Sequence, residues 1–253
     1  MKFFACSDIH SGYTPWINAL NAAGFDIDNP DHMIVLCGDL FDRMSETVAV
    51  YEFAKHLIDR NKLIYIKGNH ESLLFDCYES IKRGKIPGFH HFHNGTVKTI
   101  CQLCGQNEWI IYDPEWYPKI LNKLEEVLQF ISKNTVNYFE TANYVFVHAC
   151  LPRSDKEIPW RNASDDAWGR AMWGNPFLDY LSDPLEDKTV VFGHWHCSFG
   201  WAYAEHRSEF GQDAKFDTFF GDGYIGLDGC VVHSGQCNVH VIEDNLLEEI
   251  KGG

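Results

Sequence analysis

The chain has 253 residues and a formal net charge of −15, from 36 acidic and 21 basic residues, and 45% of it is hydrophobic. That length and composition allow a sizeable core, and we expect one domain over residues 1–253. The acidic balance argues against binding to duplex nucleic acid or to an anionic membrane surface. It would also repel a phosphorylated substrate, so a phosphate site here needs local positive charge, which metal cations could supply.

Nine cysteines are scattered along the chain, and Cys6, Cys37 and Cys150 fall in strand-like runs. An odd, scattered set favours reduced thiols over a disulfide framework, as expected in a reducing cytosol. The first residues, MKFFACSDIH, contain too short an apolar stretch for a signal peptide. No run approaches the roughly 20 apolar residues of a membrane span. The sequence therefore predicts a cytoplasmic protein that does not enter a membrane.

Short apolar runs that end in polar residues recur, and each has the length and residue types of a buried strand. They are KFFACSDIH (2–10), HMIVLCGD (32–39), KLIYIKGNH (62–70), YVFVHAC (144–150) and TVVFGHWH (189–196). Helical patterns lie between them, over 44–60 with Ser45 as the N-cap, and over 116–133. The tail, 224–243, is typical of further strands separated by glycine turns. This alternation predicts an α/β fold with a largely parallel sheet.

Each of these five runs ends in side chains that can bind a metal. They are Asp8 and His10, Asp39, Asn69 and His70, His148, and His194 and His196. Residues two apart on an extended chain point to the same side, so His194 and His196 could aim at one target. Ligands in open α/β sheets bind beyond the carboxyl ends of the strands. The sequence therefore predicts a metal site at one edge of the sheet.

Taken in order, the motifs DxH, GDxxDR, GNHE, a strand-terminal histidine and GHxH resemble those of the calcineurin-like metallophosphoesterase superfamily. GDLFDR (38–43) and GNHE (68–71), followed by VHA, are similar to the phosphoprotein-phosphatase branch and its relatives. These relatives are bacterial and phage-type protein phosphatases and symmetrical diadenosine-tetraphosphate hydrolases. IGLDGC in the tail resembles the closing strand of that branch. The resemblance implies a β-sandwich of two mixed sheets flanked by helices, with a two-metal site at one edge.

The resemblance also implies a ligand set. One metal would be held by Asp8, His10, Asp39 and His196, and the second by Asp39, Asn69, His148 and His194. Asp39 would bridge the two, because a carboxylate has two oxygens to share. Mixed nitrogen and oxygen donors suit two divalent ions, Mn²⁺ first, with Fe or Zn²⁺ as alternatives. A hydroxide that bridges the two metals would attack phosphorus in line.

Three residues receive further roles from the same resemblance. His70 would be the general acid that protonates the leaving alkoxide, and Asp42 behind it would fix its tautomer. Arg43 would bind the phosphate oxygens, for which a planar bidentate donor is well suited. Hydrolysis of a P–O bond is the reaction class that this set implies.

The chain departs from the phosphoprotein-phosphatase branch in two places. That branch has one histidine in its last motif, whereas GHWH carries the double-histidine form of the wider superfamily. His196 is therefore a ligand by analogy with the broader group, and the alternative is a hydrogen-bonding or exposed side chain. The branch also places a second arginine on the phosphate. DAWGRAMWGNP (166–176) nominates Arg170, in competition with Arg153 and Arg161.

Two groups of metal-capable residues lie outside these motifs. Cys101 and Cys104 form a CxxC without a second such pair, so we expect reduced thiols rather than a zinc site. His90, His91 and His93 in FHHFHNG are expected on a surface loop near the site entrance.

Two further stretches are interpreted from their place in the chain. Trp195, between the histidines of GHWH, is expected to face away from the metals and to pack. The aromatic-rich segment 197–223 carries no recognisable motif, and we expect it to set substrate specificity.

The sequence thus predicts a metal-dependent phosphatase for phosphomonoesters, with phosphoserine or phosphothreonine protein as the first choice of substrate. A hydrolase of diadenosine polyphosphates or related nucleotides is the alternative enzyme, because both chemistries share one metal core. A scaffold or binding module that has lost its ligands is disfavoured, because every expected ligand position is filled, together with His70 and Asp42.

Overall fold

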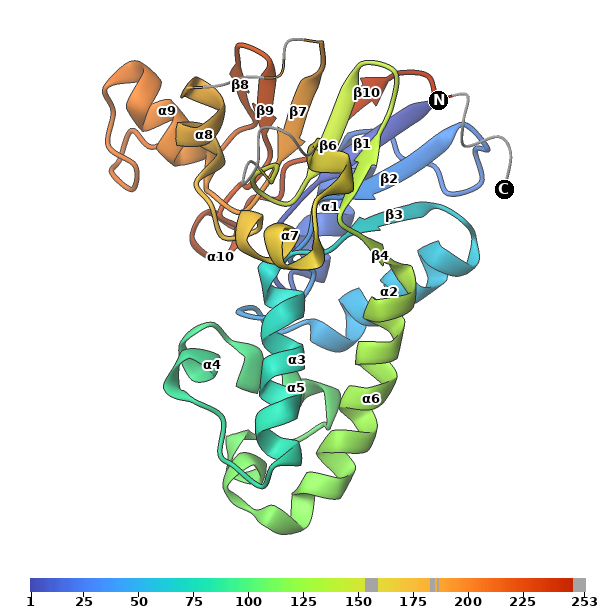
Figure 1. Cartoon of the computed structure of the whole chain (residues 1–253), viewed down its shortest axis with the longest axis vertical. Helices are drawn as coiled ribbons and strands as arrows, with labels where there is room; N and C mark the ends of the chain where they lie inside the picture. Colours follow the sequence, from blue (N-terminus) through green and yellow to red (C-terminus); the bar gives the residue numbers. More distant parts are fainter. Residues whose placement is uncertain (153–158, 183–184, 186, 248–253) are drawn as a thin grey trace.

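The computed structural model describes residues 1–152, 159–182, 185 and 187–247, and two five-stranded sheets form its upper part in Figure 1. The first sheet has the order β10 (His240–Glu243), β1 (Lys2–Cys6), β2 (His32–Leu36), β3 (Leu63–Ile66) and β4 (Thr135–Val136). The second has the order β5 (Tyr138–Glu140), β6 (Tyr144–Val147), β7 (Thr189–Phe192), β9 (Tyr224–Gly226) and β8 (Phe219–Gly221).

Both sheets are mixed, as the resemblance to the metallophosphoesterases implies, whereas the strand and helix pattern alone predicted one largely parallel sheet. In the first, β1 to β4 run parallel and β10 pairs antiparallel with β1. In the second, β6, β7 and β9 run parallel, and β5 and β8 pair antiparallel at the edges. The parallel strands of each sheet end at one edge, so the polar residues that follow them gather there.

Helices flank both sheets. Within the described residues the α-helices are α1 (Tyr13–Ala22), α2 (Thr47–Asp59), α3 (Asn69–Lys82), α4 (Phe89–His93), α5 (Thr96–Leu103), α6 (Tyr117–Asn134), α7 (Asp165–Ala171), α8 (Pro176–Ser182), α9 (Cys197–Glu205) and α10 (Val231–Ser234). Short 3-10 helices cover Glu108–Tyr112, Pro114–Trp116 and Trp160–Asn162. Helices α3 and α6 lie side by side and extend away from the sheets together with α4 and α5 (Figure 1).

The alternation of side chains along the strands separates the apolar core into layers. Phe3 and Ala5 of β1 point into a cluster between the two sheets, where they meet residues of the second sheet such as Phe146 and Val191. Phe4 of β1 points the other way, into the cluster that the first sheet shares with its helices. The outer face of the second sheet packs against α7, α8 and α9 in a third cluster. The chain is thus a sandwich of two mixed sheets between helical layers.

The five predicted strands are confirmed as β1, β2, β3, β6 and β7, and the helix predicted over 116–133 is α6. The helix predicted over 44–60 is α2, but Ser45 is not its N-cap, because the helix begins at Thr47. The N–H of Thr47 instead donates to Oε1 of Gln102, 3.0 Å away, so a side chain from α5 does the work of a cap.

Three stretches contain structure that the sequence did not predict. The histidines of FHHFHNG lie on α4 rather than on a loop, and His91 is fully buried. The segment 197–223 contains α9 and β8, and α10 interrupts the strands of the tail. These elements are short, from three to nine residues, so periodicity gives little signal for them.

All nine cysteines are free thiols, including Cys101 and Cys104. Among the described residues, the helices are too short or too polar to cross a lipid bilayer.

Replacing Phe146 with alanine tests the packing of the two sheets. Phe146 is fully buried and contacts the rings of Phe3 and Phe139, with centroids 6.3 and 5.7 Å away. We expect Phe146→Ala to lower the free energy of unfolding by about 3–5 kcal/mol, because it leaves a cavity. Val48→Ala on α2, where the residue is 49% exposed, should change it by less than about 0.5 kcal/mol. Urea denaturation measures both, and equal losses would contradict a close-packed interface.

Candidate metal centre

Seven of the predicted site residues come together at the carboxyl edges of the strands. They are Asp8 and His10 after β1, Asp39 after β2, Asn69 and His70 at the start of α3, His148 directly after β6, and His194 after β7. Two groups of donor atoms meet at Asp39, one with His10 and His70 and one with His148 and His194. Asp39 therefore occupies the place expected of a bridging carboxylate.

One ring nitrogen of His10 has a free electron pair and faces two carboxylates. Its Nδ1 donates to the carbonyl oxygen of Phe41, 3.1 Å away, so Nε2 is the free nitrogen. Nε2 lies 3.8 Å from Oδ1 of Asp8 and 3.9 Å from Oδ2 of Asp39. These separations are too long for hydrogen bonds but match atoms that surround one ion at about 2.1 Å each.

His148 has the same arrangement on the other side of Asp39. Its Nδ1 donates to the carbonyl oxygen of Cys37, 2.8 Å away. The free Nε2 then faces two acceptor oxygens, Oδ1 of Asn69 at 2.7 Å and Oδ1 of Asp39 at 3.6 Å. A metal cation placed among these three atoms would accept an electron pair from each of them. The ring of His194 lies 5.0 Å from that of His148 and completes this half.

Burial makes these donors suitable for a metal. It lowers the pKa of His10 well below the ordinary value, with help from the charges of Arg43 and His70, and lowers the pKa of His194 to about 2. Both rings are therefore neutral, which is the form that binds metals. Burial and the charges of Asp8 and Glu71 raise the pKa of Asp39. A divalent cation would offset that unfavourable concentration of negative charge, so the residues fit a dinuclear metal site.

The backbone of the centre is held in an uncommon conformation. Several non-glycine residues have positive φ, in the left-handed region that most side chains avoid. Those in the centre are Asp8 (52°), His10 (47°), Asp39 (57°), Asp42 (78°), Arg43 (65°) and His194 (67°). Glycines supply the room for this crowding, because a Cβ on Gly38 would collide with the ring of His148 and one on Gly193 with Asp8.

His70 and Asp42 form a buried pair beside Asp39. Nδ1 of His70 donates to Oδ2 of Asp42 at 2.7 Å, which leaves Nε2 facing the centre, 3.3 Å from Nη2 of Arg43. Asp42 is fixed in turn by the hydroxyls of Thr96 and Thr99 on α5, at 3.0 and 2.7 Å. Burial works against protonation of His70, but the charge of Asp39 and the hydrogen bond to Asp42 outweigh it and raise the pKa of His70.

Glu71 is a supporting residue, and the sequence predicted no role for it. Its buried carboxylate accepts the N–H groups of Asp39, Leu40 and Gly68, at 3.0, 3.0 and 2.8 Å. The hydroxyl of Tyr65 donates to it at 2.7 Å. Glu71 therefore joins the turn after β2 to the first turn of α3. Its position three residues after Gly68, at the start of a helix, was a signal that could have identified it.

His196 is not a member of either donor group, but it lies close enough to Asp8 for the charge of that carboxylate to act on its pKa. It is the N-cap residue of α9, with Nε2 3.9 Å from Oδ2 of Asp228 and Nδ1 3.7 Å from Oε1 of Glu209. Asp228 is buried after β9, where burial and the charge of Asp8 raise its pKa. Asp228 is the aspartate of IGLDGC, and the sequence predicted no role for it. Trp195 packs on Phe199, with ring centroids 5.1 Å apart, as expected.

The three arginines nominated for a second phosphate contact have different surroundings. Arg170 is exposed in the last turn of α7, and among the described residues its side chain makes no hydrogen bond or ion pair. Arg161 is held by Glu140 through two hydrogen bonds, the longer 2.9 Å, and lies over the ring of Trp160. Arg153 lies outside the described residues.

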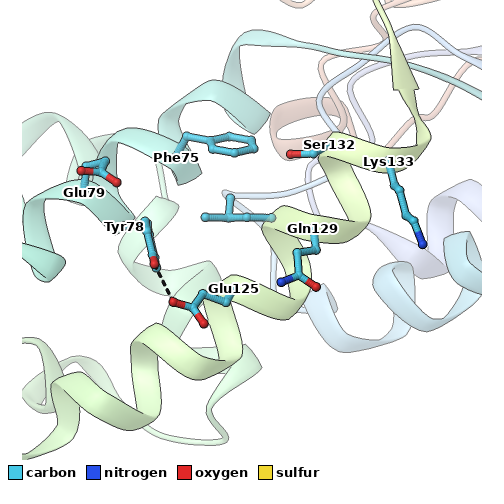
Figure 2. Close-up of a pocket in the computed structure, with 8 residues that line it drawn as sticks. Phe75, Tyr78, Glu79, Glu125, Gln129, Ser132 and Lys133 are labelled. Carbon is cyan, nitrogen blue, oxygen red and sulfur yellow. Dashed lines mark hydrogen bonds between the residues drawn. The ribbon is translucent and has the colours of Figure 1, made fainter.

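A groove of about 610 Å³ lies between α3 and α6, away from these residues. Figure 2 shows its lining, which includes Phe75 and Tyr78 of α3 and Glu125 of α6, with Tyr78 donating to Glu125 at 2.7 Å. None of the predicted site residues lines this groove.

The family model for calcineurin-like phosphoesterases matches residues 1–198. The chain therefore belongs to the calcineurin-like phosphoesterase family, a class of metal-dependent phosphoesterases. A comparison with curated proteins gave no match.

Three solved structures are similar to this chain at low sequence identity, and the first of them, with a TM-score above 0.5, shows the same fold. A proposed diadenosine tetraphosphatase is 16% identical, over 95% of this chain and 89% of that chain, with a TM-score of 0.54. A metallophosphoesterase from Sphaerobacter thermophilus is 14% identical, over 97% and 90%, with a TM-score of 0.46. A protein serine/threonine phosphatase from Saccharomyces cerevisiae is 18% identical, over 77% and 61%, with a TM-score of 0.43.

Replacing Glu71 with glutamine tests its supporting role. An amide would bring N–H groups against the backbone donors that the carboxylate now accepts, so we expect a loss of about 2 kcal/mol in the free energy of unfolding. Metal content should also fall, because the turn that carries Asp39 loosens. Glu79→Gln on the exposed side of the same helix should change neither quantity appreciably. Urea denaturation and elemental analysis provide the measurements, and an unaltered Glu71→Gln protein would contradict this role.

Proposed function

We propose that the chain hydrolyses phosphomonoesters with two divalent metal ions, Mn²⁺ first, and that phosphoserine or phosphothreonine protein in the cytoplasm is its substrate. The observation that carries the proposal is the convergence of buried donors on both oxygens of Asp39, with the His70–Asp42 pair beside them. A metal site alone would serve binding or structure. A buried, oriented imidazole next to it adds the proton donor that hydrolysis needs.

The residues divide the work of the reaction. Asp8, His10 and Asp39 would hold one ion, with His196 as the fourth candidate ligand, and Asp39, Asn69, His148 and His194 would hold the other. When bound, the two ions polarise the phosphate and lower the pKa of a water molecule between them. Arg43, whose guanidinium lies beside His70, would bind the phosphate oxygens and orient phosphorus. Arg170 on α7 is the proposed second phosphate contact.

His70 is the proposed general acid. Asp42 accepts the Nδ1 proton, so the Nε2 proton of the imidazolium points into the centre, toward the place of the leaving oxygen. The hydrogen bond from Nδ1 to Asp42 favours the protonated ring, in the direction of the raised pKa of His70. Thr96 and Thr99 act through Asp42 and position the pair.

A second candidate function is hydrolysis of dinucleoside polyphosphates, and one residue favours it. Trp173 is 51% exposed, and its ring lies edge-to-face with that of His194, with centroids 6.3 Å apart. An exposed indole beside the metal centre offers a face on which a nucleobase can stack. The motifs GDLFDR, GNHE and VHA are shared by both enzyme classes and do not separate them, so phosphoprotein is the first choice only by resemblance to the phosphoprotein-phosphatase branch.

Replacing His70 with asparagine tests its role as the acid. We expect kcat for a phosphoserine peptide, whose alkoxide leaving group needs a proton, to fall by about 10²–10⁴-fold. For p-nitrophenyl phosphate, whose leaving group is stable as an anion, the fall should be much smaller. The comparison uses steady-state kinetics with both substrates at matched metal content. Equal losses on the two substrates would show that His70 serves binding instead.

A substrate comparison separates the two candidate functions. A phosphoserine peptide and diadenosine tetraphosphate are assayed side by side, and we expect the higher kcat/KM on the peptide. Trp173→Ala should then leave peptide hydrolysis within about threefold, while any dinucleotide hydrolysis should fall about 10-fold with the lost stacking. Trp109→Ala, an exposed tryptophan outside the centre, is the control. Higher kcat/KM on the dinucleotide would replace the phosphoprotein assignment.

A further inference from the structure

A second cluster of metal-binding side chains lies outside the centre, where α4 meets α3. Asp76 of α3 and His90 and His91 of α4 bring one ligand atom each to within 4.8 Å of one another. Nε2 of His91 is 3.1 Å and Nε2 of His90 is 3.4 Å from the same carboxylate oxygen, Oδ2 of Asp76. We propose that these three residues form a third metal site, which takes Zn²⁺ or a similar divalent transition-metal ion and clamps α4 onto α3.

The donor set fits this class of ion. Two imidazole nitrogens and one carboxylate oxygen are typical Zn²⁺ ligands, and a three-residue site leaves a fourth position for water. The side chains of His90 and Asp76 are 55% and 63% exposed, so an ion can enter and keep such a water. Gly88 allows the close fit, because a Cβ there would lie 3.0 Å from the ring of His90.

His91 is the buried member of the cluster. Its ring is fully buried, and Nδ1 has no hydrogen-bond partner among the described residues. All polar contact of the ring therefore passes through Nε2 and Asp76. Burial and the neighbouring His90 lower the pKa of His91, so the ring is neutral and can use Nε2 as a ligand. The rings of His90 and His91 are in contact, with centroids 4.0 Å apart, so the two histidines lie together beside Asp76.

The cluster lies next to elements that also support the metal centre. Asp76 lies on the helix that begins with Asn69 and His70. His90 and His91 lie just before Gly95, and the next helix carries Thr96 and Thr99, which hold Asp42. An ion at the cluster would therefore tie α3 to the helix that directly precedes α5, in the part of the molecule that extends from the sheets (Figure 1).

Zinc stoichiometry tests the site directly. The metal-depleted full-length protein, its Asp76→Asn and His90→Asn variants, and a His93→Asn control are incubated with Zn²⁺, desalted and analysed for bound metal. His93 is an exposed histidine of the same helix that lies outside the cluster, so it matches His90 in kind. We expect the wild type and His93→Asn to retain about one equivalent per chain more than the two cluster variants. Equal zinc contents in all four proteins would overturn the proposal.

Thermal unfolding supplies a second measurement that does not depend on activity. With the main centre saturated by Mn²⁺, added Zn²⁺ should raise the Tm of the wild type and of His93→Asn by roughly 5 °C. Asp76→Asn and His90→Asn should show no comparable rise. Asp76 and His90 are exposed, so both variants are expected to fold, and circular dichroism checks this. A Tm rise of equal size in all four proteins would assign the zinc effect to the main centre and overturn the third site.

Discussion

Asp39 must keep a charged carboxylate buried between strand ends, close to Asp8 and Glu71, and much of the surrounding structure serves that requirement. Its Oδ1 accepts the N–H of His70 at 2.9 Å, and its own N–H donates to Glu71. These hydrogen bonds offset part of the cost of burial, but not the mutual repulsion of the carboxylates. Two cations would offset the rest. The fold therefore holds the carboxylates of Asp8, Asp39 and Glu71 close together at the edge where the metals would bind.

The strands and the residues that follow them could be predicted from the sequence, because both signals are local. Runs such as KFFAC are buried on both faces, so they are apolar throughout, and the ligands follow within a few residues. Parallel pairing then brings Asp8 and Asp39 to one edge without further information. The second sheet was predicted only from the resemblance of the motifs to a known family. His148 and His194 belong to that sheet's edge, because they follow β6 and β7.

The supporting residues could not be predicted in this way, because their partners are distant in sequence. Thr96 and Thr99 lie 54 and 57 residues from Asp42 in the sequence. The residue pattern of α5 does not indicate that they contact it. Asp228 meets His196 only because β9 pairs beside β7 in the second sheet. Helix α4 has five residues, three of them histidines, so neither period nor propensity indicated it. Long-range packing decides these features.

The left-handed backbone at Asp8 and Asp39 also limits how this centre can be lost. A change of one base turns an aspartate codon into one for asparagine, glycine or valine, among others. Asparagine and glycine tolerate positive φ, whereas valine does not, because its branched side chain clashes with the backbone. Of these three, asparagine and glycine are therefore the replacements with which a descendant could abandon the metals and still keep the fold. The positive φ at these positions thus excludes some substitutions because they destabilise the fold, whether or not activity is still needed.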